Sequence, residues 1–498
     1  MSDGRYRVYL RERYRTLCGY AGVLFILIGL IILAPAGLVL FFPAEKYMAV
    51  GFLLPGSGLT LFGFAVRLFL GPKQNEILSL TEGAALVVIA WGAAIFMGAL
   101  PFLWAGLDLT RAVFEATSGW TTTGLSVVDV EVVSPLLLFF RSLMQLAGGA
   151  GLAILMISAM TGPAGAGLAT AEGRSEQLVP HVRQSARLVV ILYCGYIFLG
   201  VGALKFAGMD WFDAVNHAFC AVSTGGFSTR TESIAFWNSP IIEAVLIVLM
   251  LLGSVNFLTA YTLLQGRWRS ALRNGELRVM TLLLTGAALL LFLGVTFIDS
   301  KETADQIREA IFQAVAALST TGFATVSFSE WNSLGWMIII MSMLIGGGAG
   351  STAGGIKQQR IYLLLKGLKR EASEVFLPAK AVCEDVFWVG NHQRLLAESD
   401  LRKACSYIAL YLFTWLIGGC AISAFGHPLA DSLFEFASCL GTVGLSVGVT
   451  ASSAADGQLW VQSIGMLLGR LEFFVIFWGI IKIGSDLSIL LTKGYALD

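Results

Sequence analysis

Apolar stretches long enough to cross a bilayer recur along almost the whole chain. A membrane-spanning helix needs about 20 predominantly apolar residues, and ten segments of the 498-residue sequence approach this requirement. Hydrocarbon offers exposed backbone no hydrogen-bond partners, so such segments must form helices or closed barrels. We therefore expect an all-α polytopic membrane protein. The ten segments are residues 18–42, 47–70, 82–104, 135–160, 186–207, 239–264, 279–299, 334–349, 404–425 and 460–491.

The composition agrees with this expectation and excludes other classes. Hydrophobic residues make up 56% of the chain and charged residues 13%, about half the charged share usual in soluble domains. The 33 basic and 33 acidic residues balance to a net charge of +0, which gives no support for a nucleic-acid partner. The seven cysteines form no CxxC pair, so we interpret them as small buried hydrophobes rather than metal ligands or a disulfide framework.

The distribution of basic residues predicts the orientation. The first apolar stretch, Leu17 to Phe42, is too long for a signal-peptide core and is expected to be a retained span. Arginine and lysine gather before this stretch, near 266–278 and along 356–403. With ten spans these three segments share one side, and the positive-inside rule makes that side cytoplasmic. Both termini are therefore expected in the cytoplasm.

Four short segments of similar sequence lie between these apolar stretches. Each has about ten mainly apolar residues, too few to cross a bilayer, followed by the pattern Thr-x-Gly-[Leu/Phe]. We predict four units of span, re-entrant pore helix, loop and span, which can surround one axis. The segments are AVFEATSGWTTTGLS from Ala112, AVNHAFCAVSTGGFS from Ala214, AIFQAVAALSTTGFA from Ala310 and SLFEFASCLGTVGLS from Ser432.

The four loops have the composition of an ion filter. A dehydrated cation needs a ring of oxygens, and backbone carbonyls supply them in known filters. Glycine lets the backbone adopt the conformations that aim carbonyls inward. The loops hold no Asp or Glu, which disfavours a ring of charged side chains. The predicted ion-binding filter residues are Thr122, Thr123, Gly124, Thr224, Gly225, Gly226, Thr320, Thr321, Gly322, Thr442, Val443 and Gly444.

Acidic residues near the loops could concentrate cations at the entrance. Taken singly, each is better explained as an ordinary solvated loop residue. These acids include Asp108, Glu115, Asp129, Glu131, Asp213, Asp305 and Glu435.

A glycine-rich stretch, GGGAGSTAGG, interrupts the span after the third filter. Each glycine costs up to about 1 kcal/mol relative to alanine in a helix, so the stretch is predicted to unwind into a flexible constriction below the filter. Close helix packing through small residues is the alternative. The predicted gating residues are Gly346, Gly347, Gly348, Gly350, Gly354 and Gly355, together with Arg470.

Charged residues inside apolar stretches are costly and mark candidate functional sites. Arg470 either lies in the pore beneath the filter, where it repels cations, or pairs structurally with Glu472 or another carboxylate. We interpret the other charges as span-end residues whose stems follow the apolar surface. They are Arg141, Lys205, Glu243 and Lys482.

Other function classes find little support. A phosphate-binding loop would need Gly-Lys-[Ser/Thr] before a helix, and an intramembrane enzyme would need a catalytic constellation such as HExxH. Neither occurs, so we do not expect an enzyme. A carrier with inverted repeats is disfavoured because the four units run parallel.

The four loops, the glycine-rich interruption and Arg470 together resemble the Trk/Ktr/HKT superfamily of potassium transporters. The two additional N-terminal spans make the chain most similar to the bacterial TrkH/TrkG branch, from about residue 15 onward. The resemblance implies four span–pore-helix–span repeats in a pseudo-four-fold array plus two extra N-terminal spans. The implied divisions are 1–75 (two-span extension), 76–180, 181–270, 271–400 with the gating loop, and 401–498.

The resemblance also implies a function. It predicts selective, channel-like potassium uptake across a bacterial inner membrane, with K+ at the filter carbonyls and no organic cofactor. The glycine-rich loop would be the gate, Arg470 its barrier, and each subunit of a homodimer would hold its own pore. A cytosolic nucleotide-binding subunit of the TrkA type would dock on the cytoplasmic face, where 356–403 is a plausible part of the surface.

A sodium-permeable or sodium/proton-coupled transporter of the same architecture is the alternative. All four loops keep glycine, whereas serine in the first is associated with sodium permeation in some plant relatives. The chain departs from its own repeat pattern at Gly225 and Val443, which leaves the fine selectivity open.

Overall fold

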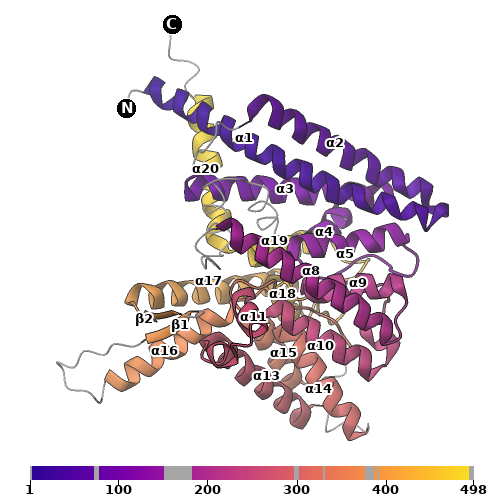
Figure 1. Ribbon diagram of the computed structural model, residues 1–498, viewed down its shortest axis with the longest axis vertical. Coiled ribbons are helices and arrows are strands. Elements are labelled where there is room, and N and C mark those ends of the chain that lie inside the picture. The colour runs from indigo at the N-terminus through magenta and orange to yellow at the C-terminus, as the bar shows by residue number, and fades with distance from the viewer. Residues whose placement is uncertain are drawn as a thin grey trace. The chain divides into compact units, whose positions relative to one another are not determined.

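The computed structural model describes residues 3–71, 78–150, 182–295, 302–328, 331–374, 376, 386–389 and 392–492. The chain forms two compact units (Figure 1). The first unit comprises Met1–Trp120, Val132–Ile191 and Leu471–Asp498; the second comprises Thr121–Glu131 and Leu192–Arg470.

All regular elements among the described residues of the first unit are helices. Its elements are α1 (Asp3–Leu33), the 3-10 segments η1 (Ala34–Leu40) and η2 (Pro43–Glu45), α2 (Lys46–Leu70), α3 (Leu80–Trp104), α4 (Leu109–Trp120), α5 (Pro135–Ala150), the start of α8 (Val182–Phe206) and α20 (Phe473–Thr492).

Small residues bring α1 and α2 into close contact. A β-carbon at Gly22 would lie 2.8 Å from the carbonyl oxygen of Gly63, and one at Gly63 would lie 2.6 Å from that of Gly22. Lipid gives apolar helices no hydrophobic reason to associate, so such close backbone approach supplies the contact energy. Figure 1 shows the two helices side by side over most of their length.

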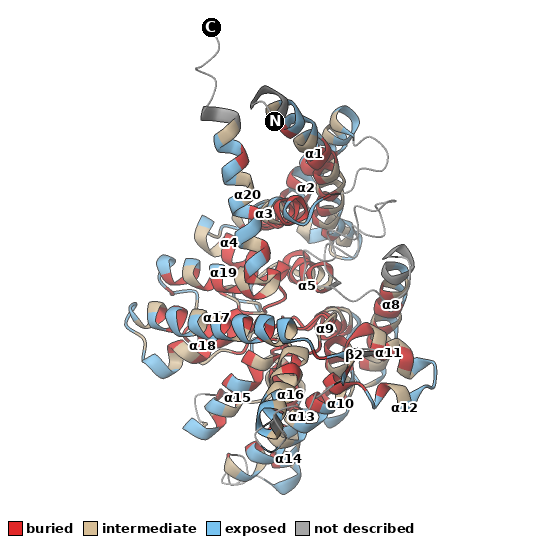
Figure 2. Cartoon of the chain, turned by 90° about the vertical axis from the view of Figure 1, so that its left-hand side faces the viewer, coloured by how far each residue is buried: buried red, intermediate tan, exposed pale blue. Residues whose placement is uncertain are grey.

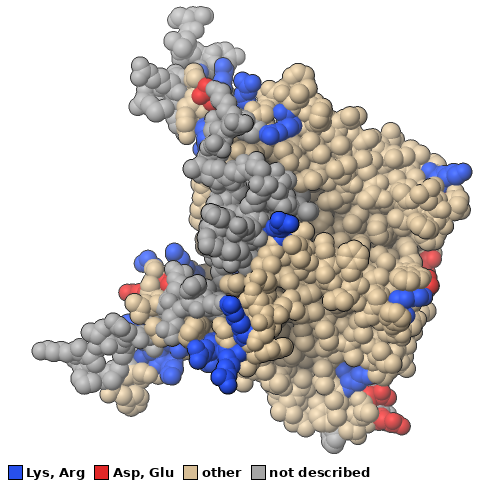
Figure 3. Space-filling view, in the orientation of Figure 1, with Lys and Arg blue, Asp and Glu red and all other residues tan. Residues whose placement is uncertain are grey.

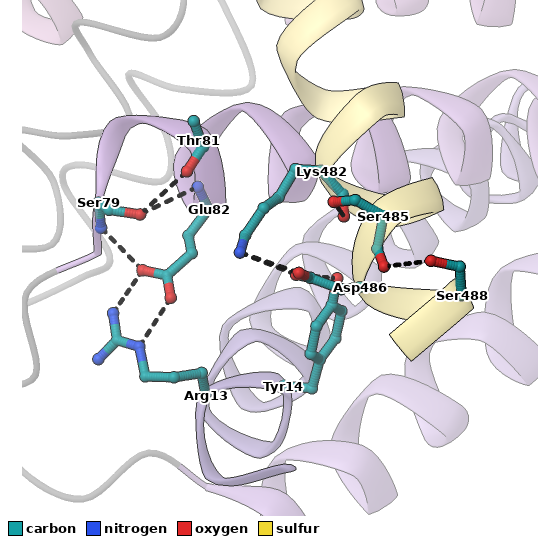
Figure 4. Close-up of polar contacts among 9 residues, drawn as sticks. All are labelled: Arg13, Tyr14, Ser79, Thr81, Glu82, Lys482, Ser485, Asp486 and Ser488. Atoms are coloured by element: carbon teal, nitrogen blue, oxygen red, sulfur yellow. Dashed lines mark hydrogen bonds and ion pairs between the residues drawn. The ribbon is translucent and has the colours of Figure 1, made fainter. Parts of the chain in front are cut away.

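Polar contacts join α1, α3 and α20 at one end of this unit (Figure 4). Arg13 of α1 pairs with Glu82, whose carboxylate also accepts from the backbone of Ser79 in a capping box at the start of α3. Tyr14 donates to Asp486 of α20 at 2.9 Å, and Lys482 pairs with the same carboxylate at 2.9 Å. Three segments far apart in sequence are thereby fixed together.

The second unit contains most of the four repeats. Its elements are the rest of α8, α9 (Trp211–Val222), η3 (Ser233–Trp237), α10 (Pro240–Ser254), α11 (Phe257–Leu264), α12 (Trp268–Ala271), α13 (Gly275–Gly294), α14 (Thr303–Leu318), α15 (Ser333–Ile345), α16 (Gln358–Glu374), β1 (Val386–Val389), β2 (His392–Leu395), α17 (Glu398–Ser423), α18 (Leu429–Gly441) and α19 (Asp456–Leu471).

The short helices of this unit are its core. Figure 2 shows α9 mostly buried, whereas α17 mixes exposed and buried residues along its length. α9 packs against α10, α14 against α13 and α15, and α18 against α15 and α17. Each of these three pore helices is therefore held by neighbouring apolar helices, whose exposed apolar residues suit a lipid environment.

Several helices have the length and composition of membrane spans. Among the described residues, six are long and apolar enough, and two broken pairs raise the number to eight. The remaining two predicted spans differ from simple helices. α5 begins the predicted span 135–160, but residues 151–160 lie outside the described residues, as do 296–299 of span 279–299. α15 covers only Ser333–Ile345 because the glycine-rich stretch ends it.

An antiparallel hairpin, β1 and β2, was not predicted from the sequence. Its Phe387 is buried in a small apolar cluster with Leu363 of α16 and Leu396 and Ala404 near the start of α17. Figure 3 shows Lys and Arg side chains gathered over this end of the second unit. The Arg273 guanidinium carbon lies 5.8 Å from the ring centroid of Trp388 in β1.

Two charges interpreted as span-end residues are instead buried, so that interpretation was wrong. The Arg141 side chain is 2% exposed and pairs at 3.3 Å with Glu115, which is fully buried within α4. Glu243 is 2% exposed and pairs at 3.3 Å with Arg308. Sequence hydropathy does not show which charges face each other, and pairing is what makes their burial tolerable.

We expect Arg141→Met to destabilise the first unit by about 3–5 kcal/mol, because it leaves the Glu115 carboxylate buried without its cation. Thermal unfolding of the purified protein in detergent measures this as a lowered midpoint.

The matched control is Arg111→Met, which breaks the half-exposed pair with Asp108. It should cost less than about 1 kcal/mol. Equal unfolding midpoints for the Arg141 and Arg111 variants would contradict a larger contribution of the buried pair to stability.

Candidate functional site

Each of the four pore helices ends directly before a Thr-x-Gly loop. α4 ends at Trp120, α9 at Val222, α14 at Leu318 and α18 at Gly441. In the last three the chain turns through a Schellman motif: the N–H of Gly225, Thr321 and Val443 donates to the carbonyl five residues earlier. The preceding threonine donates to the carbonyl three residues earlier, which completes the motif.

Threonine occupies the left-handed position in all four loops. The φ angles of Thr122, Thr224, Thr320 and Thr442 are 57°, 53°, 56° and 51°. Helices usually place glycine there, because a β-carbon in this conformation costs about 1–2 kcal/mol. Strain repeated four times at equivalent positions indicates a functional requirement.

The backbone then alternates in handedness. The glycine two residues after each threonine also has positive φ, from 76° at Gly226 to 100° at Gly444. The residues between them, Thr123, Gly225, Thr321 and Val443, have negative φ. Alternation of this kind turns successive carbonyls toward one side of the chain, which is how known filters present oxygens to an ion.

The four loops form a closed ring. A β-carbon at Gly124 would overlap the carbonyl oxygen of Gly225, and one at Gly226 would overlap that of Thr321. The same holds for Gly322 with Val443, and for Gly444 with Thr123. Each glycine thus accommodates a carbonyl of the next repeat, and the fourth repeat returns to the first. All twelve predicted filter residues lie in this ring within the second unit.

Hydroxyl groups brace the ring from behind. Thr121 and Thr123 share a hydrogen bond of 2.8 Å, and Ser319 and Thr321 one of 2.7 Å. Ser438 of α18 accepts from the N–H of Gly444 at 2.9 Å. The sequence analysis missed these supporting residues, although Ser319 and Thr121 occupy the same column of the repeat.

The glycine-rich stretch forms a loop against the ring. α15 ends at Ile345, α16 begins at Gln358, and the predicted break in the helix is present. Thr352 Oγ1 lies 2.9 Å from the carbonyl oxygen of Gly253 and 3.2 Å from that of Val222, and these two acceptors share its one hydrogen. It also accepts from the Thr224 hydroxyl at 3.1 Å.

Two more threonines at the ring contact the same loop. The N–H of Gly354 donates to Thr320 Oγ1 at 2.8 Å. A β-carbon at Gly354 would overlap Thr442 Oγ1 and the carbonyl oxygen of Gly441. The loop therefore lies directly against the threonines of the second, third and fourth repeats.

Charged side chains hold this loop from two directions. Arg470 of α19 donates to the carbonyl of Thr352 at 2.7 Å. Glu276, buried at the start of α13, accepts from the N–H of Ala349 at 3.0 Å. The sequence analysis found Arg470 but missed Glu276, because nothing in its local pattern connects it with a loop 73 residues away. It also gave no role to Thr352, although this residue belongs to the glycine-rich stretch itself.

A break in α10 makes room for the loop. α10 and α11 meet at an angle of 116° around Val255 and Asn256. The carbonyls freed there accept from the loop: Ser254 from Gly348 at 2.9 Å and Gly253 from Thr352 at 3.1 Å. Backbone groups of two broken helices thus satisfy each other, as membrane depth requires.

A family model described as TrkH, cation transport protein, matches residues 61–487. An uncharacterized cation transporter of Methanocaldococcus jannaschii is 30% identical over 90% of this chain and 92% of its own. The Trk system potassium uptake protein TrkH of Escherichia coli K12 is 31% identical over 81% of this chain and 86% of its own.

A solved structure supports the same likeness. The crystal structure of the potassium transporter TrkH from Vibrio parahaemolyticus matches with a TM-score of 0.80 and 26% identity. The match covers 97% of this chain and 100% of that one. The predicted fold class, an all-α polytopic membrane protein, is confirmed.

We expect Gly322→Ala to reduce cation flux by at least about a hundredfold, because its methyl group would occupy the place of the Val443 carbonyl oxygen in an already left-handed position. The measurement is tracer uptake into proteoliposomes, normalised to folded protein from size-exclusion chromatography.

Gly286→Ala is the matched control, because a β-carbon there meets nothing within 4 Å. It should leave the flux unchanged. Wild-type flux in folded Gly322→Ala protein would contradict the ring geometry.

Proposed function

The chain belongs to the TrkH family of cation transport proteins, and on that premise we propose that it takes up potassium by selective, channel-like permeation through its ring of four Thr-x-Gly loops. Membership in this family makes it a multi-pass membrane transporter and not an enzyme. The relatives named as Trk potassium uptake proteins support potassium as the transported ion.

The observation that carries the proposal is the closure of the ring. Glycines and carbonyls of four repeats alternate around one axis, so the filter oxygens belong to backbone and not to charged side chains. Potassium gives up its water to such carbonyl rings. The twelve filter residues named from the sequence, from Thr122 to Gly444, are the proposed K+ site.

We propose that the glycine-rich loop closes the path beneath this filter. Gly346 and Gly355 both have positive φ and pack against each other, so the loop is tightly folded on itself. Its contacts with Thr224, Thr320 and Arg470 support a position of this backbone and positive charge beneath the filter. The cation on Arg470 opposes a permeating cation by Coulomb repulsion. A purely structural role, in which Arg470 only caps the loop carbonyl, is the alternative.

The cellular location, the partners and the domain divisions are also proposals. Both termini are assigned to the cytoplasm of a bacterium and the protein to its inner membrane, as the distribution of basic residues favours. A homodimer and a TrkA-type nucleotide-binding subunit are the expected partners. The basic surface around α16 and the hairpin supports the cytoplasmic assignment of that end of the second unit (Figure 3). The repeat boundaries at about residues 76, 181, 271 and 401 remain the proposed domain divisions.

The sodium alternative is tested directly. Purified protein in proteoliposomes should carry K+ at least about tenfold faster than Na+ under equal gradients, the ratio expected for 1.4 kcal/mol of preference. Competition between the two ions in one vesicle provides the control for vesicle size. Equal rates, or K+ flux that needs Na+ or a proton gradient, would establish the alternative and overturn the proposal.

The gate is tested at Arg470. Arg470→Ala removes both the charge and the bond to Thr352, so the flux should rise at least severalfold, with reduced response to any regulator. Arg470→Lys keeps the charge and should stay near wild type if repulsion is the cause. Tracer flux per folded protein measures both. Unchanged flux and unchanged regulation in Arg470→Ala would leave the arginine with a structural role only.

A further inference from the structure

The four pore helices carry a polar side chain at the same position, nine residues before the filter glycine. Sequence analysis treated two of these residues as ordinary loop acids, but all four lie inside helices and are fully buried. Burying an isolated polar group costs free energy unless it is hydrogen-bonded. The residues are Glu115, His217, Gln313 and Glu435.

Three of these side chains bond the segment that follows their own filter. His217 Nε2 lies 3.0 Å from Ser228 Oγ, two residues after Gly226. Glu435 accepts from Ser446 Oγ, at the same distance after Gly444, with oxygen separations of 2.8 and 3.1 Å. The residue types differ, but both bonds join the position nine residues before the filter glycine to the position two residues after it.

The third repeat keeps the bond although it lacks the partner. Ala324 stands where the other repeats have serine, and a methyl group cannot bond. Gln313 Nε2 instead donates to the next residue, Thr325, at 2.9 Å. A change on one side of the contact is thus matched by a change on the other, which is expected if the contact itself is needed.

Around His217 the contact is also fixed in direction. Nδ1 lies 2.8 Å from the carbonyl oxygen of Asp213, which can only accept. In the neutral ring Nδ1 therefore carries the proton, and Nε2 accepts from the Ser228 hydroxyl. The ring packs edge-to-face on Trp237 at 4.8 Å and lies 5.7 Å from Phe323, which follows the filter glycine of the third repeat.

Glu435 holds a longer stretch of chain. Besides Ser446, its carboxylate accepts from the N–H of Val447 at 3.2 Å and of Thr450 at 3.1 Å, and from the Thr450 hydroxyl. The whole turn after the fourth filter is therefore tied to the pore helix by one side chain. Such multiple charge-assisted bonds are the strong class of hydrogen bond.

We propose that His217, Gln313 and Glu435 are positioning residues that set ion selectivity, by holding the chain after each filter glycine against its pore helix. The inference rests on the proposed potassium function. None of the three is part of the carbonyl ring; each fixes how far its loop can move outward. A loop released at this point lets the ring widen, and a wider ring discriminates less between potassium and sodium.

The test is the K+/Na+ permeability ratio of variants in proteoliposomes, taken from reversal potentials. His217→Leu, Gln313→Leu and Glu435→Leu remove the bond, and each should lower the ratio by roughly five- to tenfold, the factor that corresponds to about one hydrogen bond. A ratio does not depend on how many molecules are folded, so partial misfolding alone does not change it.

Two further variants separate positioning from packing. His217→Gln installs the side chain that the third repeat uses, with Ser228 and Thr229 in the columns of Ala324 and Thr325, and should restore the ratio to within about twofold of wild type. Asn216→Leu is the matched control: Asn216 is equally buried in α9, but its side chain donates to Phe212 and not to the segment after the filter. Its ratio should equal that of wild type.

The outcomes distinguish the two levels of the proposal. If the wild type carries no K+, the proposed function fails. If the wild type is selective and the three leucine variants keep its ratio, the positioning role is wrong while the function stands. A ratio lowered equally by Asn216→Leu, or not restored by His217→Gln, would also overturn the positioning role.

Discussion

The ring depends on one repeated contact: a backbone carbonyl of each repeat fills the space that a β-carbon on the next repeat's filter glycine would need. A bulkier residue at any of these four positions would overlap the neighbouring repeat, so the backbone of one repeat requires glycine in the next. The left-handed threonines before the glycines bend the chain so that these contacts can form. Much of the second unit supports this geometry, through Schellman turns, hydroxyl pairs and the packing of α9, α14 and α18 on neighbouring helices.

Internal satisfaction of polar groups is the second constraint. At membrane depth, unwound backbone has no water to bond, yet this chain unwinds at the four loops, at α10 and at Gly346–Lys357. The broken helix α10 and the glycine-rich loop bond each other, and Glu276 and Arg470 bond what is left of the loop. The buried pairs Glu115–Arg141 and Glu243–Arg308 follow the same rule. Each of these buried charges has a specific partner.

The sequence predicted the features that repeat and missed those that depend on contact. Four copies of Thr-x-Gly predict a common structure, and a glycine-rich stretch predicts a helix break. Both patterns can be recognised from a few neighbouring residues. Glu276 and Thr352 give no local signal, and their role appears only when residues more than 70 positions apart meet. Glu115 and Glu435 were placed in loops because a ten-residue helix has weak periodicity. The hairpin β1–β2 was missed because each of its strands has only four residues, too few for a recognisable alternation.

Fusion of the four loops into one chain has a consequence for how such a pore can change. In a homotetrameric channel one codon specifies all four quadrants, so any substitution near the ions is imposed four times at once. Here Gly225 and Val443 already differ from their counterparts Thr123 and Thr321 while the ring stays closed. Substitutions can therefore accumulate in one repeat while the other three stay unchanged. The glycine-rich loop after the third repeat shows how far a single repeat can diverge.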